Sequence, residues 1–274
     1  MRAAMERELE TAAVVGPDGF IGRNLVDRLE AAGVAVSGVR KETPIRAVSD
    51  APVDCVFFCA GNSAPHRTRD DPQFCLQRNV TELHEYLTEL DYRTFVHFSS
   101  CAVYPPDSER KRPDATLDPG DISLYGAHKL LSERYVREFA ERWIILRPAY
   151  LYGPGLWKNV IYDLRTGQER IFLDPDSELS ILDVRHLADA AIALARSVEN
   201  DVFNVASEYL VSVRELLEMA PGEYTFRDER YINHDGIALE TLHDHWCEPL
   251  SRRQHERRIQ AFLESGDVNR EKGL

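Results

Sequence analysis

Short apolar runs and segments of helical periodicity alternate along most of the chain. Residues 12–15 and 55–60 are apolar throughout, as strands buried on both faces are. In residues 20–32 apolar side chains instead recur on one helix face, and Gly33 ends the pattern. The predicted strands are Ala12–Val15, Val34–Val39, Cys55–Ala60, Phe95–Ser99, Trp143–Leu146 and Val202–Val205. The predicted helices are Phe20–Ala32, Pro72–Leu90, Leu124–Glu141, Val184–Ser197 and Val213–Met219.

This alternation predicts an α/β protein with a doubly wound parallel sheet, because strands joined through helices pair in parallel and the helices cover both faces. Ligands of such sheets bind at the carboxyl ends of the strands. Residues 1–155 and 180–206 would form the domain that contains the sheet. We expect residues 156–179 and 207–274 to form a smaller C-terminal lobe that closes over a substrate.

A glycine-rich turn joins the first predicted strand to the first predicted helix. Residues 16–22 read Gly-Pro-Asp-Gly-Phe-Ile-Gly, a G-x-x-G-x-x-G spacing. A strand, a glycine turn and a helix in this order can bind the pyrophosphate of a dinucleotide, because the backbone approaches closely and the helix N-terminus offers N–H groups. The residues predicted to bind the cofactor here are Gly16, Asp18, Gly19, Phe20, Ile21 and Gly22.

Tyr125 and Lys129 are four residues apart in a predicted helix, so their side chains share one face. A nearby ammonium favours the phenolate, and we expect Lys129 to lower the pKa of Tyr125 from about 10. Such a tyrosine can exchange a proton with a carbonyl oxygen. Ser100 follows a predicted strand and would orient the same oxygen. The predicted catalytic residues are therefore Ser100, Tyr125 and Lys129.

These pieces and several others follow the order found in extended short-chain dehydrogenases/reductases. From Val14 to about Leu217 the chain resembles the NAD-dependent epimerase/dehydratase group of that family. The matching segments are 16–22, 56–61, 79–80, 99–104, 125–129, 146–155, 183–190 and 202–206. The resemblance implies a Rossmann fold, an NAD(P) cofactor and a catalytic serine four residues before Tyr104, which selects Ser100 over Ser99.

The resemblance also implies further site residues. The implied cofactor contacts beyond the glycine turn are Arg40, Cys59, Ala60, Gly61, Asn79, Tyr125, Lys129, Pro148 and Tyr150. The implied substrate contacts are Ser100, Tyr125 and Asn159. Asn79 would brace its helix or a relay water, and Pro148 and Tyr150 would hold the nicotinamide end. Asn159 matches an asparagine that contacts a nucleotide diphosphate in relatives. However, Leu179 replaces the family's arginine, so a carbonyl substrate without a nucleotide stays open.

Arg40 bears on the choice of cofactor. It follows the second predicted strand, where relatives that prefer NAD carry an acidic residue for the ribose hydroxyls. A guanidinium there would attract a 2′-phosphate, so we expect NADP(H), with NAD(H) as the alternative. The stretch from Lys41 to Pro52 is short, whereas relatives fit another helix and strand there. The sequence therefore does not define the adenine contacts.

The residues after the catalytic serine limit the reaction. Nucleotide-sugar 4,6-dehydratases carry Asp-Glu at this place, whereas this chain has Cys101 and Ala102. Neither side chain can shuttle a proton as a carboxyl group does, which argues against dehydration. We therefore expect a nucleotide-sugar 4-ketoreductase, with a nucleotide-sugar 4-epimerase as the alternative. A non-catalytic NADP-binding sensor is the alternative from another class.

Composition limits the partners. The chain has 33 basic and 46 acidic residues and a net charge of −13, which argues against nucleic acid and anionic membrane surfaces. Its five cysteines include no C-x-x-C pair, which indicates reduced thiols and a cytoplasmic location. We expect no metal, since residues 243–247 resemble an ordinary loop rather than a ligand set. By resemblance we expect a homodimer that pairs helices 72–90 and 124–141.

Overall fold

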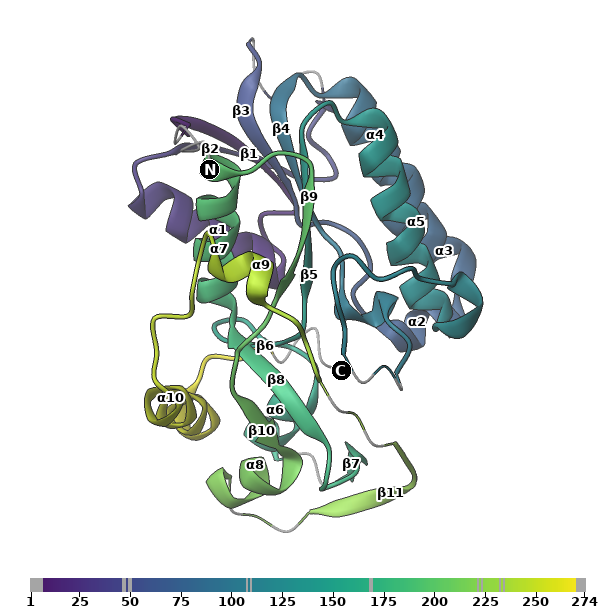
Figure 1. Ribbon diagram of the computed structural model, residues 1–274, viewed down its shortest axis with the longest axis vertical. Coiled ribbons are helices and arrows are strands. Elements are labelled where there is room, and N and C mark those ends of the chain that lie inside the picture. Colours follow the sequence, from purple (N-terminus) through teal and green to yellow (C-terminus); the bar gives the residue numbers. More distant parts are fainter. Residues whose placement is uncertain are drawn as a thin grey trace.

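A parallel sheet of six strands, in the order β2-β1-β3-β4-β5-β9, forms the centre of the molecule (Figure 1). The computed structural model describes residues 7–45, 48, 51–106, 108, 110–167, 170–220, 222, 224–231, 233 and 235–269. The strands are β1 (Thr11–Val15), β2 (Ala35–Val39), β3 (Val53–Phe58), β4 (Tyr92–Phe98), β5 (Trp143–Pro148) and β9 (Asp201–Val205). The predicted doubly wound parallel sheet is confirmed.

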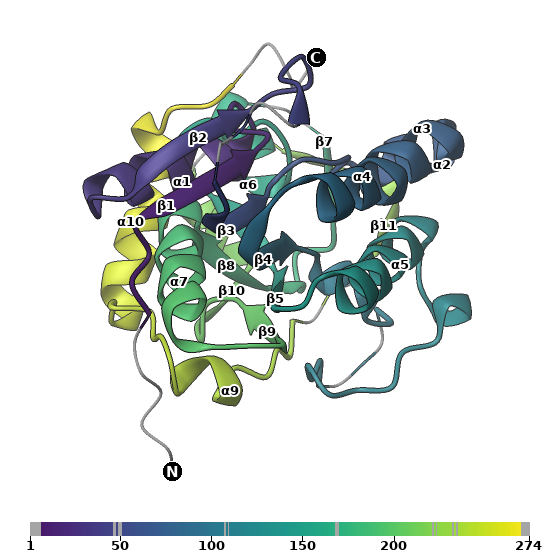
Figure 2. The ribbon, with the colours of Figure 1, turned by 90° about the horizontal axis from the view of Figure 1, so that it is seen from above.

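Helices cover both faces of this sheet (Figure 2). Helices α1 (Phe20–Ala31) and α7 (Val184–Ser197) lie on one face, and α4 (Glu82–Glu89) and α5 (Leu124–Phe139) lie on the other. Successive side chains of β3 pack on opposite faces of the sheet. Cys55 and Phe57 pack in the core under α1 and α7, whereas Val56 and Phe58 pack in the core under α4 and α5. Burial on both faces explains why the strands are apolar at consecutive positions.

The helix predicted at 72–90 is interrupted. It comprises α3 (Pro72–Leu76), a π-helical segment η2 (Gln77–Thr81) and α4. A separate short helix, α2 (Pro65–Asp70), precedes it and was not predicted. Asp71 lies between α2 and α3, and its Oδ1 accepts a hydrogen bond from the Phe74 N–H at 3.0 Å. The π-helical segment contains Asn79, and such segments recur at functional sites.

A smaller group of elements lies beyond the carboxyl end of β5 (Figure 1). Strands β6 (Tyr150–Tyr152), β8 (Glu178–Asp183) and β10 (Leu210–Ser212) form a second sheet, and β7 (Arg170–Leu173) pairs with β11 (Thr225–Tyr231). The helices of this part are α6 (Val160–Thr166), α8 (Val213–Met219) and α10 (Arg252–Ser265), whereas α9 (Glu240–His243) lies beside α7 and contacts β9 (Figure 1). Of these elements, α8 is among the helices predicted above, and the charge run at 252–258 also favoured a solvated helix face, where the structure has α10. Within the described ranges, no helix is both long and apolar enough to cross a membrane.

Buried polar side chains hold α10 against the rest of the protein. The Glu248 carboxylate accepts a hydrogen bond from Ser207 Oγ at 2.7 Å, and His255 Nδ1 of α10 lies 3.0 Å from its other oxygen. Burial by itself raises the pKa of Glu248. Hydrogen bonds from His186, His255 and Ser207 outweigh it and lower the pKa to about 2. The ionised carboxylate therefore stabilises the folded state.

The Glu248→Gln variant tests this stabilisation. The folded-state pKa lies below the ordinary value of 4.5, so the carboxylate contributes stability above about pH 4.5 and loses it as the pH falls toward 2. We expect the variant to lose about 3 kcal/mol of unfolding free energy at pH 7 and clearly less at pH 3. Urea unfolding at both pH values measures this, with Glu264→Gln on the exposed side of α10 as the control. An equal loss at both pH values would contradict the assignment.

Candidate active site

The glycine turn between β1 and α1 forms a tight cradle. The Gly16 N–H donates to the Val39 carbonyl at 3.0 Å, and the Gly19 N–H donates to the Gly16 carbonyl at 3.2 Å. A Cβ at Gly22 would lie 2.1 Å from the Gly16 oxygen, so only glycine permits this approach of helix to turn. No side chain caps the N-terminus of α1, and its first turn contains no acidic residue. Its free N–H groups therefore fit the pyrophosphate of a dinucleotide.

The residues after β3 lie beside this turn. An added Cβ at Gly16 would lie 3.1 Å from the Ala60 backbone, which brings Ala60 and its neighbours Cys59 and Gly61 to the cradle. Asn79, in the π-helical segment, accepts a hydrogen bond from the Asn62 N–H at 2.9 Å through its Oδ1. Its Nδ2 has no hydrogen-bond partner among the described residues. Asn79 thus braces the loop after β3.

Arg40 and Asp18 meet at the outer end of the cradle. Arg40 Nε and Nη2 donate to the two carboxylate oxygens of Asp18 at 2.7 and 2.9 Å, a bidentate pair. Arg40 follows β2, and Asp18 lies within the glycine turn. The structure thus joins two predicted cofactor residues to each other. The sequence did not indicate this pairing.

Ser100 and Tyr125 are brought together by a close contact between two segments. A Cβ at Gly126 would lie 2.1 Å from the Ala102 oxygen, so α5 rests directly on the short helix η3 (Cys101–Val103). The Ser100 side chain begins η3 by accepting from the Ala102 N–H at 3.1 Å. The Ser100 side chain lies near enough to the Tyr125 phenol to lower the pKa of that phenol, which is 7% exposed. Ser100 is therefore the serine beside the tyrosine.

Lys129 lies one turn after Tyr125 in α5 and is 6% exposed. Its Nζ donates to the Phe98 carbonyl at 3.0 Å, and its charge acts on the Cys59 thiol beside the cradle. Burial lowers the pKa of Lys129 to about 8. Burial also raises the pKa of Tyr125 to about 12, with an opposing effect from Ser100. The expectation that Lys129 lowers this pKa is wrong for the protein by itself, because desolvation dominates.

A buried ion pair fixes α5 against the sheet. Glu133 lies one turn after Lys129, and its carboxylate accepts from Arg147 Nε and Nη2 at 2.9 and 2.7 Å. Ser99 Oγ donates to the same carboxylate at 2.6 Å. Glu133 and Arg147 are 1% and 2% exposed. The sequence reasoning missed Glu133, although its spacing already placed it on the helix face of Tyr125 and Lys129.

The remaining predicted residues lie farther along the same edge. Pro148 ends β5, and Tyr150 begins β6. Asn159 has a φ of 95° and caps α6, since its Oδ1 accepts from the N–H groups of Ile161 and Tyr162. Its Nδ2 donates to the Leu151 carbonyl at 2.8 Å. The Asn159 amide therefore already has protein partners, and its contact with a substrate stays a prediction.

A second cation, Lys158, was not predicted. Its Nζ lies 5.2 Å from the centre of the Trp157 ring. Burial lowers the pKa of Lys158 to about 7, and repulsion from Lys129 adds to this effect. Two ammonium groups therefore act on each other in this part of the protein.

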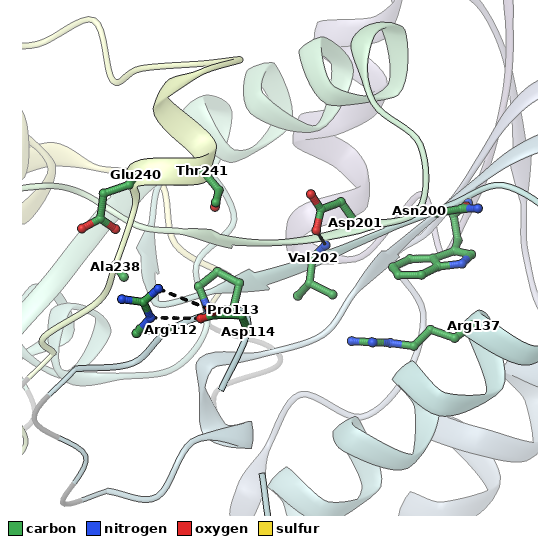
Figure 3. Close-up of a pocket in the computed structure, with 11 residues that line it drawn as sticks. Arg112, Pro113, Asp114, Arg137, Asn200, Asp201, Val202, Ala238, Glu240 and Thr241 are labelled. Atoms are coloured by element: carbon green, nitrogen blue, oxygen red, sulfur yellow. Dashed lines mark hydrogen bonds and ion pairs between the residues drawn. The ribbon is translucent and has the colours of Figure 1, made fainter. Parts of the chain in front are cut away.

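A groove of about 580 Å³ lies elsewhere (Figure 3). Trp143 and Asp201, the first residues of β5 and β9, line it together with Arg112 and Asp114. It is thus at the amino ends of these strands, whereas the cradle and Ser100 follow carboxyl ends. Arg112 and Asp114 pair with each other at 3.0 Å. The groove is not part of the candidate active site.

The fold and this edge of the sheet define a Rossmann-type dinucleotide-binding protein, and comparisons with known proteins identify its family. The sequence model of the NAD dependent epimerase/dehydratase family matches residues 12–206. The chain belongs to this family and is an NAD(P)-dependent enzyme of the short-chain dehydrogenase/reductase type.

The individual proteins that this chain resembles have low sequence identity to it. The chain is 24% identical to the probable low-salt glycan biosynthesis reductase Agl14 of Haloferax volcanii over 73% of this chain and 76% of that protein. It is similar to the structure of MoeE5 with UDP-glucose and NAD, with a TM-score of 0.81, 20% identity and coverage of 92% and 98%. It is also similar to RMD from Pseudomonas aeruginosa with NADPH, with a TM-score of 0.72, 23% identity and coverage of 93% and 97%.

The Glu133→Gln variant tests the ion pair under the site. Loss of the carboxylate leaves the Arg147 guanidinium buried without its counter-charge, which we expect to cost about 3 kcal/mol of unfolding free energy. Glu138→Gln in the same helix is the matched control, because the Arg134–Glu138 pair is exposed. We expect the control to change stability by no more than about 0.5 kcal/mol. Urea unfolding gives both values, and similar losses in the two variants would refute a special role for Glu133.

Proposed function

We propose that this protein is an NADP(H)-dependent reductase that acts on the C4 carbonyl of a keto-sugar nucleotide. The observation that carries the proposal is the close packing of α5, with Tyr125 and buried Lys129, on the short helix that Ser100 begins, at the sheet edge that also holds the glycine turn. Together these features supply a proton donor and a dinucleotide cradle within one edge of one sheet. The presence of Ser100, Tyr125 and Lys129 together argues against a non-catalytic NADP-binding sensor, because a sensor would not need all three residues.

The chain's own residues account for the proton transfer. When bound, the reduced nicotinamide supplies a hydride to the carbonyl carbon. Tyr125 donates its hydroxyl proton to the carbonyl oxygen, which becomes the oxygen of the product alcohol. Because its pKa is raised to about 12, Tyr125 stays protonated at neutral pH and is ready to act as an acid. Ser100 orients the same oxygen by a hydrogen bond, and Lys129 would hold a ribose hydroxyl of the cofactor.

Two cations support an anionic substrate. Lys129 and Lys158 repel each other, and burial lowers the pKa of each. A bound anion would relieve this repulsion and favour the charged form of both ammonium groups. The diphosphate of a nucleotide sugar has the required charge. Lys158 thus adds an argument for a nucleotide-linked substrate that the motifs alone did not provide.

The relatives support reduction with a phosphorylated cofactor. Agl14 is described as a probable reductase, and RMD is described in complex with NADPH. The Arg40 guanidinium at the outer end of the cradle suits a 2′-phosphate. A 4-epimerase that retains NAD is the alternative, and the complex of MoeE5 with UDP-glucose and NAD is in keeping with it. An epimerase would use Tyr125 first as a base, when the alcohol is oxidised, and then as an acid, when the ketone is reduced.

We also propose that one part of the chain binds the dinucleotide and another part binds the substrate. Residues 1–155 and 180–206 would bind the dinucleotide, and residues 156–179 and 207–274 would form the substrate lobe, although β6 and β8 pair within the sheet of the smaller part. A separate buried cluster that includes Ile161, Leu216 and Ile259 supports this division. Leu239 and Leu242 instead pack in the core under α1 and α7, so part of the lobe is anchored on the first domain. The buried thiols Cys55 and Cys75, which form no disulfide, support a cytoplasmic location.

The Tyr125→Phe variant tests the chemistry. Without the proton donor, we expect kcat for reduction of a UDP-4-keto-hexose to fall at least about 100-fold, because general acid catalysis contributes on that scale. The dissociation constant for NADPH should stay within about twofold, since the phenol is not part of the phosphate cradle. Absorbance of NADPH and calorimetry provide the two readouts. Tyr92→Phe is the control, because the Tyr92 hydroxyl bonds only the Leu87 carbonyl among described residues.

Cofactor consumption separates the candidate functions. A reductase oxidises one NADPH for each keto sugar reduced. An epimerase converts a UDP-hexose to its 4-epimer with no net change in cofactor. A protein that binds NADP(H) but turns over neither type of sugar would support the sensor and contradict the reductase.

A second copy of the chain is the proposed partner. Among the described residues, the large apolar side chains that are most exposed gather on two helices. They are Phe74 and Leu76 of α3, and Leu124, Leu131 and Phe139 of α5. Their exposed fractions lie between 40% and 49%. The same helices were predicted to pair in a homodimer, and burial of this stripe against its copy would remove it from water.

The Leu131→Glu variant tests the homodimer. We expect the wild-type protein to have twice the chain mass of 31.3 kDa in solution. A charge placed in the middle of the α5 stripe should convert it to a monomer, because an unpaired carboxylate would be buried at the interface. Light scattering after size-exclusion chromatography measures both masses. Gln260→Glu on α10 adds the same charge elsewhere and should leave the dimer intact. A monomeric wild-type protein would disprove the proposal.

A further inference from the structure

The contact between Asp18 and Arg40 bears on which cofactor the protein selects. Two short hydrogen bonds join the guanidinium fork of Arg40 to both oxygens of the Asp18 carboxylate. The backbone holds the two residues in register, since the Gly16 N–H donates to the Val39 carbonyl at 3.0 Å. Pro17 of the turn also lies against Gly38 of β2. The pair therefore follows from the way the turn packs on the end of β2.

A carboxylate and a phosphate compete for the same donors. Both present two oxygens in a plane that matches the guanidinium fork, and both carry negative charge. In this structure the Asp18 carboxylate already occupies Nε and Nη2 of Arg40, a pair of donors that matches a phosphate as well. A phosphate that replaced it would also meet the charge of Asp18 nearby.

We propose that Asp18 is a specificity residue that weakens binding of NADP(H) relative to NAD(H) by engaging the guanidinium of Arg40. This inference rests on the proposed function only in that it requires a nicotinamide dinucleotide in the cradle. NADP(H) must displace the carboxylate from the guanidinium, whereas NAD(H) carries no 2′-phosphate and leaves the pair in place. The relative affinity for NADP(H) and NAD(H) thus depends on Asp18 in the glycine turn as well as on Arg40 after β2.

The test is calorimetric titration of NADP⁺ and NAD⁺ into the wild-type protein and its variants. Asp18→Asn keeps the shape of the side chain but removes its charge. Loss of one exposed charge interaction should tighten NADP⁺ about fivefold and change the dissociation constant of NAD⁺ by less than about twofold. Glu30→Gln is the control for net charge, because Glu30 lies at the far end of α1 and is exposed. It should leave both constants unchanged.

A double-mutant cycle tests whether Asp18 acts on NADP⁺ binding through Arg40. In an Arg40→Gln background, Asp18→Asn should tighten NADP⁺ by clearly less than in the wild-type background, because no guanidinium remains to be released. Asp18→Ala gives the same comparison without an amide that could bind Arg40. If the ratio of the two dissociation constants is the same in wild type and both Asp18 variants, the inference is wrong while the reductase proposal stands. If neither cofactor binds to any variant, both are wrong.

Discussion

The buried pair of Glu133 and Arg147 is the constraint on which the candidate active site depends. Glu133 shares a helix face with Tyr125 and Lys129, so the direction of one side chain fixes the direction of the others. Arg147 of β5 and Ser99, directly after β4, both donate to the Glu133 carboxylate. The rotation of α5 is thus set by two neighbouring strands. As a result, Tyr125 faces the serine that follows β4.

The same sheet edge unites the phosphate cradle and the proton donor. The cradle follows β1, the residues beside it follow β3, and Ser100 follows β4. Parallel strands place all three at one edge, where ligands of this class of sheet bind. Lys129 connects the two regions, because it bonds the Phe98 carbonyl and its charge reaches the Cys59 thiol. The parallel sheet therefore places the phosphate cradle and the proton donor at one site.

The sequence predicts the central sheet and its motifs well, because apolar runs and glycine spacing are local signals. It does not predict β6, β8 and β10, whose few residues carry little periodicity. The π-helical turn at Asn79 also escapes prediction, since it differs from an α-helix only in its hydrogen bonds. The raised pKa of Tyr125 was missed because a motif shows the neighbouring charge but not the depth of burial. The Asp18–Arg40 pair depends on packing between turn and strand, which spacing does not reveal.

A crystal structure of the protein with NADP(H) and a nucleotide sugar tests the central claim most directly. The account predicts that the nicotinamide ring lies beside Tyr125, with the sugar C4 oxygen about 3 Å from both the phenol and the Ser100 hydroxyl. Lys129 should then contact the ribose next to that ring. A nicotinamide ring bound away from Tyr125, or a sugar whose C4 oxygen is out of reach of the phenol, would contradict it.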